Sequence, residues 1–180
     1  MAKGQKACSW NVGMSNLGVN ARCFLARYSP KNIDSPFTRR MRLTKPIMDP
    51  KFDHMLETRE KDIIWTSISL GSPADTASVA RSFYARQFKS AFCEALESRG
   101  YDKDGRRLVL DSEGKVIGKS KPGLSCTIQI ILNPPIKHAE REELVKEAGV
   151  LVQELERLQE KPWLLHEGRQ AAKLRNTRKT

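Results

Sequence analysis

The only acidic and histidine residues that cluster in the sequence are Asp49, Asp53, His54 and Glu57. If residues 50–60 form a helix, Asp53 and Glu57 lie one turn apart on the same face, because residues four positions apart are neighbours on a helix. A carboxylate pair beside a histidine can bind a metal ion or transfer a proton. A solvated helix face explains the same residues without chemistry. We therefore predict no catalytic residue, no metal ligand and no cofactor.

Sequence motifs of enzymes are absent elsewhere in the chain. There is no G-x-S-x-G, no H-E-x-x-H, no Walker lysine loop and no G-x-G-x-x-G. The four cysteines, Cys8, Cys23, Cys93 and Cys126, include no C-x-x-C pair, which argues against a zinc ribbon. We expect a protein that is not an enzyme, with free thiols in a reducing, intracellular compartment.

Basic side chains are concentrated at the two ends of the chain. The net charge is +8 over residues 1–48 and +5 over residues 161–180, whereas residues 49–160 carry −2. Segments with this excess of positive charge bind polyanions, because they neutralise the phosphates and release counterions. The layout favours a nucleic-acid-binding protein.

Arginine is the residue best suited to such contacts, because its guanidinium matches phosphate geometry and stacks on exposed bases. Arg39, Arg40 and Arg42 form the tightest basic cluster. A helix over residues 75–99 would carry Arg81, Arg86 and Lys89 on its outer face, where ordinary solvation explains them equally well. The predicted RNA-binding residues are Arg22, Arg27, Arg39, Arg40, Arg42, Lys45, Lys119, Lys121, Arg169, Lys173, Arg175, Arg178 and Lys179.

The middle of the chain contains the elements of a folded core. Alternating β-branched residues predict strands at 63–70 and 126–132, and residues 108–117 read as a hairpin. Apolar residues at steps of three and four predict helices over 75–99 and 138–160. We expect one α+β domain at 50–160, with about four strands and two long helices packed on one face.

The order of helix, three strands and helix over residues 75–160 resembles a double-stranded-RNA-binding domain. Such domains use basic residues at the start of the last helix, where this chain has Glu140, Glu142 and Glu143. We therefore do not assign that family. A near-neutral α+β core with basic extensions also resembles the general architecture of ribosomal proteins.

The ends are predicted to be extended basic arms, residues 1–49 and 161–180. Apolar and basic side chains alternate over residues 37–43, which suggests a short extended piece there. Residues 1–28 have a second interpretation as a mitochondrial presequence, with Arg27 placed before a possible cut after Tyr28. We expect a chain without residues 1–48 and 161–180 to fold and to bind RNA poorly.

These observations lead to one function and two alternatives. The first is a structural component of a large ribonucleoprotein, most specifically a mitochondrial ribosomal protein whose arms neutralise rRNA phosphates beside neighbouring proteins. No apolar run approaches the about 18 residues of a spanning helix, and we expect neither a membrane nor a small-molecule partner. The alternatives are a viral coat or nucleocapsid protein, which would self-associate along the stripe from Leu144 to Leu158, and an RNA-processing enzyme or its subunit.

Overall fold

A four-stranded sheet forms the centre of the computed structural model, which describes residues 13–71, 77–110, 116–120 and 123–160. Its strands, in spatial order, are β1 (Ser15–Asn16), β2 (Phe24–Ser29), β6 (Cys126–Leu132) and β3 (Ile64–Leu70). β2 is antiparallel to β6, and β3 is parallel to it. The predicted strands at 63–70 and 126–132 are confirmed as β3 and β6.

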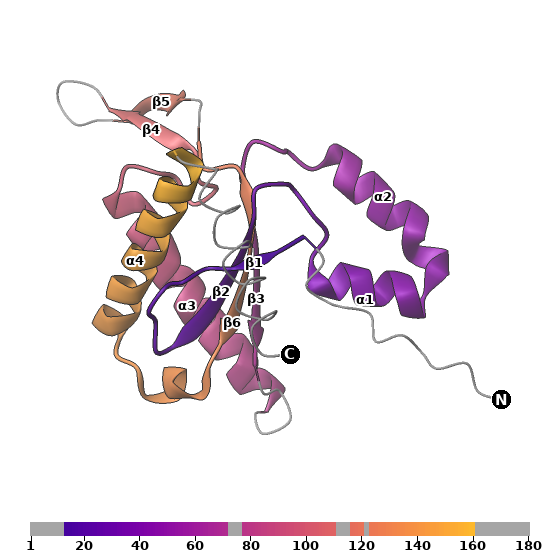
Figure 1. Ribbon diagram of the computed structural model, residues 1–180, viewed down its shortest axis with the longest axis horizontal. Helices are drawn as coiled ribbons and strands as arrows, with labels where there is room; N and C mark the ends of the chain where they lie inside the picture. The colour runs from indigo at the N-terminus through magenta and orange to yellow at the C-terminus, as the bar shows by residue number, and fades with distance from the viewer. Residues whose placement is uncertain (1–12, 72–76, 111–115, 121–122, 161–180) are drawn as a thin grey trace, which may run out of the picture.

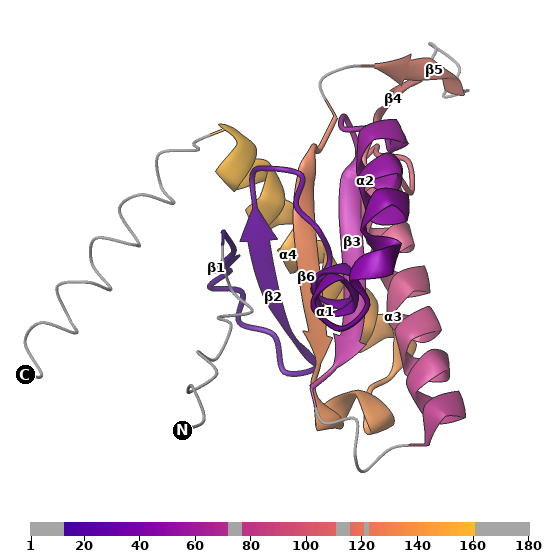
Figure 2. The same cartoon turned by 90° about the vertical axis from the view of Figure 1, so that its right-hand side faces the viewer.

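Two long helices, α3 (Ser78–Ser98) and α4 (Arg141–Glu160), cover one face of this sheet (Figure 2). A short 3-10 helix, η2 (Pro134–His138), connects β6 to α4. The predicted stripe of α4 is buried from Leu144 to Leu158. In the core, the rings of Phe24 and Phe88 meet edge to face at 4.9 Å. The predicted α+β fold, with two long helices packed on one face, is confirmed.

The membership of the sheet differs from the prediction. β4 (Arg107–Leu110) and β5 (Val116–Ser120) form a separate antiparallel ribbon, and their connection at 111–115 lies outside the described residues. The sheet takes β1 and β2 from the N-terminal region instead. The three strands between α3 and α4 therefore form no single meander, which separates this topology from that of a double-stranded-RNA-binding domain.

The prediction that residues 1–49 form an extended arm is wrong for the part that the structure describes. β2 lies inside the sheet, and its Phe24, Ala26 and Tyr28 are almost fully buried against α3 and α4. A cut after Tyr28 would remove β1 and nearly all of β2 from the sheet. The fold thus favours retention of these residues over the presequence interpretation. Residues 1–12 and 161–180 lie outside the described residues.

Residues 36–58 form a helical hairpin on the opposite side of the sheet from α3 and α4 (Figure 1). It comprises α1 (Pro36–Thr44), the 3-10 turn η1 (Pro46–Met48) and α2 (Asp49–Thr58). α2 meets the condition, stated for the acidic cluster, that residues 50–60 form a helix. The extended piece predicted at 37–43 is wrong, because Ser35 caps a helix there: its Oγ accepts the Thr38 N–H at 3.1 Å.

Two glycines provide a matched test of the backbone. Gly149 lies within α4 with open space beside it, so Gly149→Ala should raise the free energy of unfolding by about 0.4–1 kcal/mol. Gly105 has a φ of +80°, and an added Cβ would lie 2.5 Å from Cγ1 of Ile64. Gly105→Ala should therefore lower the free energy of unfolding by more than about 1 kcal/mol. Urea denaturation of both variants measures these changes. Equal changes in the free energy of unfolding would contradict the backbone environments described for the two glycines.

Candidate nucleic-acid interface

A basic groove of about 510 Å³ runs between β3 and α3. β3 is the edge strand of the sheet and lies next to α3 (Figure 2). The basic residues that line the groove are Arg59, Arg86, Lys89 and Lys103, and the one acidic lining residue is Asp104. The excess of cations favours an anionic occupant.

The edge of β3 adds uncharged hydrogen-bonding groups to this groove. The N–H of Gly71 donates to Leu132 on β6, whereas the N–H of Ile64 donates away from β6 to the carbonyl of Asp104. Alternate residues of a strand in a parallel ladder bond to the same side. Thr66 and Ile68 share the parity of Ile64, so their backbone groups point to the open edge. The groove therefore combines basic side chains with backbone donors and acceptors.

Arg59 at the end of α2 is positioned by Trp65, the second residue of β3. Its guanidinium carbon lies 4.3 Å from the centre of the indole ring, and the indole N–H donates to the carbonyl of Glu60 at 2.8 Å. Partial burial lowers the pKa of Arg59, but an arginine stays charged at neutral pH. The cation–π contact holds one positive charge at the mouth of the groove.

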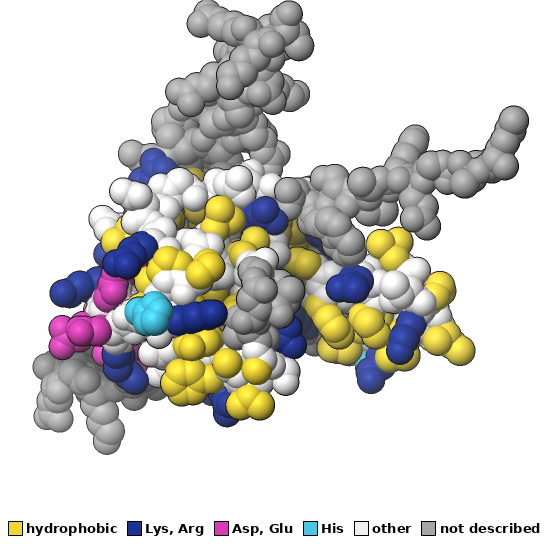
Figure 3. All heavy atoms as spheres, turned by 90° about the horizontal axis from the view of Figure 1, so that it is seen from below, with side chains coloured by type: hydrophobic (Ala, Val, Ile, Leu, Met, Phe, Trp, Pro, Cys, Tyr) yellow, Lys and Arg dark blue, Asp and Glu magenta, His cyan; other side chains and the backbone are white. Residues whose placement is uncertain are grey.

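A second basic surface lies on α1. Arg40 and Lys45 are exposed and form no ion pair with any described residue, and Arg39 lies on the same helix. Phe37, Leu43 and Ile47 beside them are also largely exposed. Hydrophobic and basic side chains alternate over the hairpin at the right of Figure 3. Arg40 and Lys45 are therefore accessible on this surface, whereas Arg39 is partly buried, and RNA binding by these residues stays a prediction.

Arg42, predicted to bind RNA, is instead an internal contact of the hairpin. Its guanidinium lies 2.7 Å from Asp53 and 3.1 Å from Asp34, with Asp49 at 3.8 Å. It also lies 5.6 Å from the centre of the Phe52 ring. The hydrogen bond to Asp53 and the surrounding carboxylates raise the pKa of Arg42. The spacing of basic residues along α1 cannot reveal which of them faces α2.

The same contacts account for the acidic cluster of α2. Asp49 and Asp53 direct their carboxylates to Arg42, and His54 and Glu57 are exposed. Among the described residues these four do not form a group with metal-ligand spacing. Their arrangement agrees with the interpretation of these residues as a helix face without chemistry. The two aspartates have a structural role in the hairpin.

Arg22 and Arg27 belong to the core domain rather than to an arm. Arg22 is exposed before β2, 3.8 Å from Glu143. Arg27 lies on the sheet face away from α3 and α4, and its Nε donates to Oδ1 of Asn16 at 3.2 Å. Lys119 lies in β5, but its side chain is outside the described part. The remaining predicted residues that lie outside the described ranges are Lys121, Arg169, Lys173, Arg175, Arg178 and Lys179.

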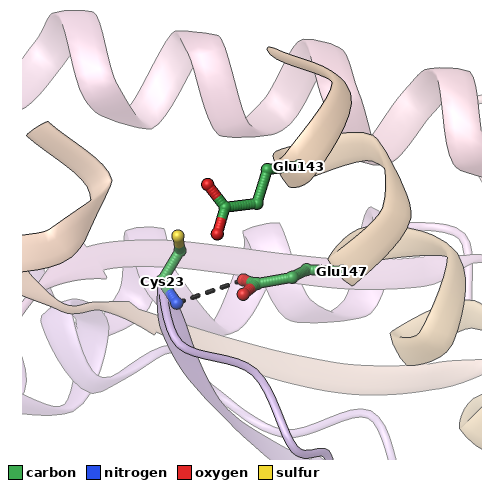
Figure 4. A group of neighbouring side chains, drawn as sticks. All are labelled: Cys23, Glu143 and Glu147. Carbon is green, nitrogen blue, oxygen red and sulfur yellow. Dashed lines mark hydrogen bonds between the residues drawn. The ribbon is translucent and has the colours of Figure 1, made fainter. Parts of the chain in front are cut away.

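Cys23, Glu143 and Glu147 are the one group in the described part of the chain with the spacing of metal ligands (Figure 4). Cys23 is fully buried immediately before β2, and both glutamates belong to α4. Glu147 accepts the backbone N–H groups of Arg22 and Cys23 at 2.8 and 3.1 Å. These hydrogen bonds occupy both carboxylate oxygens, so the group serves to attach the start of β2 to α4.

Burial raises the pKa of the Cys23 thiol to about 11, and the charges of Glu147 and Glu143 act in the same direction. Burial likewise raises the pKa of Cys126 to about 12. The described cysteines, Cys23, Cys93 and Cys126, form no disulfide, as predicted. Protonated, buried thiols of this kind are poor nucleophiles and poor metal ligands at neutral pH.

These shifts predict a loss of stability in alkali. Below pH 9 the thiols are protonated in both states, so their contribution to folding is complete. Above pH 9.0, the ordinary thiol pKa, the unfolded chain ionises first, because Cys23 and Cys126 resist ionisation until about pH 11 to 12. Urea denaturation from pH 8 to 10.5 should show a falling free energy of unfolding. The fall should be smaller in Cys23→Ala/Cys126→Ala, and an unchanged fall would contradict the prediction.

The groove was not predicted as a unit. Arg86 and Lys89 stood out as outer-face residues, but Arg59 and Lys103 carried no signal in the sequence, because they approach α3 only in the folded chain. No protein-family model matches this sequence, and no curated protein or solved structure is significantly similar to it. No helix in the described ranges has the length and apolar character needed to cross a membrane.

Proposed function

We propose that this protein is a structural RNA-binding component of a large ribonucleoprotein, most specifically a ribosome. The observation that carries the proposal is the distribution of charge. The chain has a net charge of +11, and several of its acids are paired with arginines of the same domain. Four basic residues and one acidic residue line the groove, and Arg40 and Lys45 form no ion pair with a described residue, which suits a polyanion.

The role proposed for the fold is to place these cations. The groove between β3 and α3 and the outer face of α1 offer two basic surfaces on opposite sides of the sheet. A component with two such surfaces can contact more than one RNA segment of a particle. The exposed apolar residues of α1 suit a neighbouring protein of the same particle.

The two alternatives receive less support. Self-association through the α4 stripe requires an accessible stripe, and Leu144, Leu151 and Leu155 are buried inside the monomer. An enzymatic role for Asp53 requires a free carboxylate, whereas Asp53 contacts Arg42 at 2.7 Å. The mitochondrial form of the proposal depended on a cut after Tyr28, so it stays a prediction from the sequence alone.

Gradient sedimentation of lysate from the source cell tests the proposal with the full chain. We expect the protein to sediment with ribosomal particles and to move to the top of the gradient after ribonuclease treatment or at high salt. In purified form it should bind RNA with an affinity that falls steeply as salt rises. A protein that stays at the top of the untreated gradient and binds no RNA at 50 mM salt would overturn the proposal.

A further inference from the structure

We propose that the groove between β3 and α3 binds single-stranded RNA, with phosphates on Arg86, Lys89 and Lys103 in the groove and a base stacked on Phe83 beside it. This inference rests on the proposed function and names the site and the form of RNA. It departs from the expectation that the chain ends carry the RNA contacts.

The phosphate contacts follow from the spacing of the basic residues. Arg86 and Lys89 are three positions apart on α3, so they project from the same side of the helix. Lys103 approaches the same groove from the loop after α3. Arg86 donates its Nε–H to the carbonyl of Ser82 at 3.2 Å, and its terminal nitrogens form no hydrogen bond with a described residue. Three cations along one groove suit the repeated charges of a phosphodiester backbone.

The stacking contact follows from an exposed aromatic ring on α3. Phe83 is 56% exposed, although most phenylalanines in a folded domain are buried. Its ring lies 5.5 Å from that of Tyr84 in an edge arrangement, which limits its orientation. Phe83 does not line the groove itself, but it precedes the lining residue Arg86 by three positions on α3, so an aromatic face and a cation occur on the same stretch of helix. This pairing is typical of proteins that bind single strands, because unpaired bases can stack on the ring.

The open edge of β3 favours RNA over DNA. The backbone N–H and C=O groups of Thr66 and Ile68 point to this edge, and the Thr66 side chain is exposed in the groove. A ribose 2′-hydroxyl can both donate to and accept from such groups, whereas deoxyribose lacks this hydroxyl. A double helix would keep its bases away from Phe83, so the ring favours a single strand.

Fluorescence anisotropy with the full chain and labelled oligouridine of 12 nucleotides tests the inference. Arg86→Ala/Lys89→Ala should weaken binding at least tenfold at 100 mM salt. It should also reduce the slope of log K against log salt by about 1.4, since each single-strand contact contributes about 0.7. Phe83→Ala should weaken binding about tenfold, and Phe83→Trp should restore it. The matched control Lys137→Ala/Lys146→Ala removes two exposed charges outside the groove and should have a much smaller effect.

The outcomes separate the two proposals. If the wild-type chain binds oligouridine and the groove variants bind equally well, the groove assignment is wrong and the proposed function stands. If the chain binds no RNA of any form, both are wrong. Stronger binding of a 12-base-pair RNA duplex than of oligouridine, with the same sensitivity to Phe83→Ala, would overturn the single-strand assignment. An extended peptide of alternating valine and glutamate could also displace the RNA. If it did so at a concentration lower than that of the RNA, β3 would be identified as a peptide-binding edge, and the single-strand assignment would be overturned.

Discussion

A chain that begins at Lys31 should not fold. It lacks β2, which pairs six residues with β6 and buries Phe24, Ala26 and Tyr28 in the core. Burial of a phenylalanine or comparable side chain contributes about 1.5–3 kcal/mol. A domain of this size has only about 5–15 kcal/mol of stability, so loss of the strand removes a large share of it. Circular dichroism should show no cooperative thermal transition.

The matched control is a chain that begins at Gly13, which retains every described strand. It should unfold in one transition close to that of the full chain. A cooperative transition in the shorter chain would show that β6 tolerates an open edge and that β2 is dispensable. The same comparison corrects the expectation that residues 1–48 can be removed as a unit, because that segment includes β1, β2 and α1.

Replacing Phe88 by alanine should lower the free energy of unfolding by about 3–5 kcal/mol. Phe88 is fully buried on α3, where its ring meets that of Phe24 edge to face. The substitution removes most of the side chain from a close-packed site, and the surrounding helix and sheet can close only part of the cavity. Urea denaturation at neutral pH measures the change.

Phe83→Ala is the control for this substitution, because it makes the same chemical change on the exposed face of the same helix. Its free energy of unfolding should change by less than about 0.5 kcal/mol. Similar losses in the two variants would mean that α3 is rotated relative to the packing described above. Together the variants distinguish the face of α3 that stabilises the fold from the face proposed to bind RNA.

The elements with a strong period were predictable from the sequence. β6 alternates Ile128 and Ile130 with polar residues, and α4 repeats leucine at steps of three and four. Such patterns identify the element and, in α4, its buried side, whereas in β6 the polar Thr127 and Gln129 are buried as well. The C-terminal end of α3 was predictable from Gly100. This residue adopts a positive φ of 79°, which glycine accommodates without strain.

β2 and α1 were missed because local composition obscured their patterns. Phe24, Ala26 and Tyr28 alternate toward the core, but Arg22 before the strand and Arg27 within it made the segment resemble a basic arm. In α1, apolar and basic residues alternate over a short stretch, which imitates a strand. The cap at Ser35 with Pro36 after it was the better signal, since this pair is typical of a helix start.

The candidate site could not be predicted, because its residues come from separate parts of the chain. Arg59 ends α2, Arg86 and Lys89 lie on α3, and Lys103 follows that helix. Only the packing of α3 beside the edge strand β3 brings them to one groove. The loss of Arg42 from the predicted set has the same origin, since its acidic neighbours include residues of the following helix.

The position of β6 between β2 and β3 also governs the order in which the new chain can fold. Both neighbours of β6 are synthesised before it. β2 can pair with β6 only after about a hundred further residues have been synthesised. Until Leu132 leaves the ribosome, the apolar faces of β2 and β3 have no central strand to join. The sheet therefore assembles only after β6 has emerged, and a nascent chain that carries this many cations spends that interval beside the RNA of the translating particle.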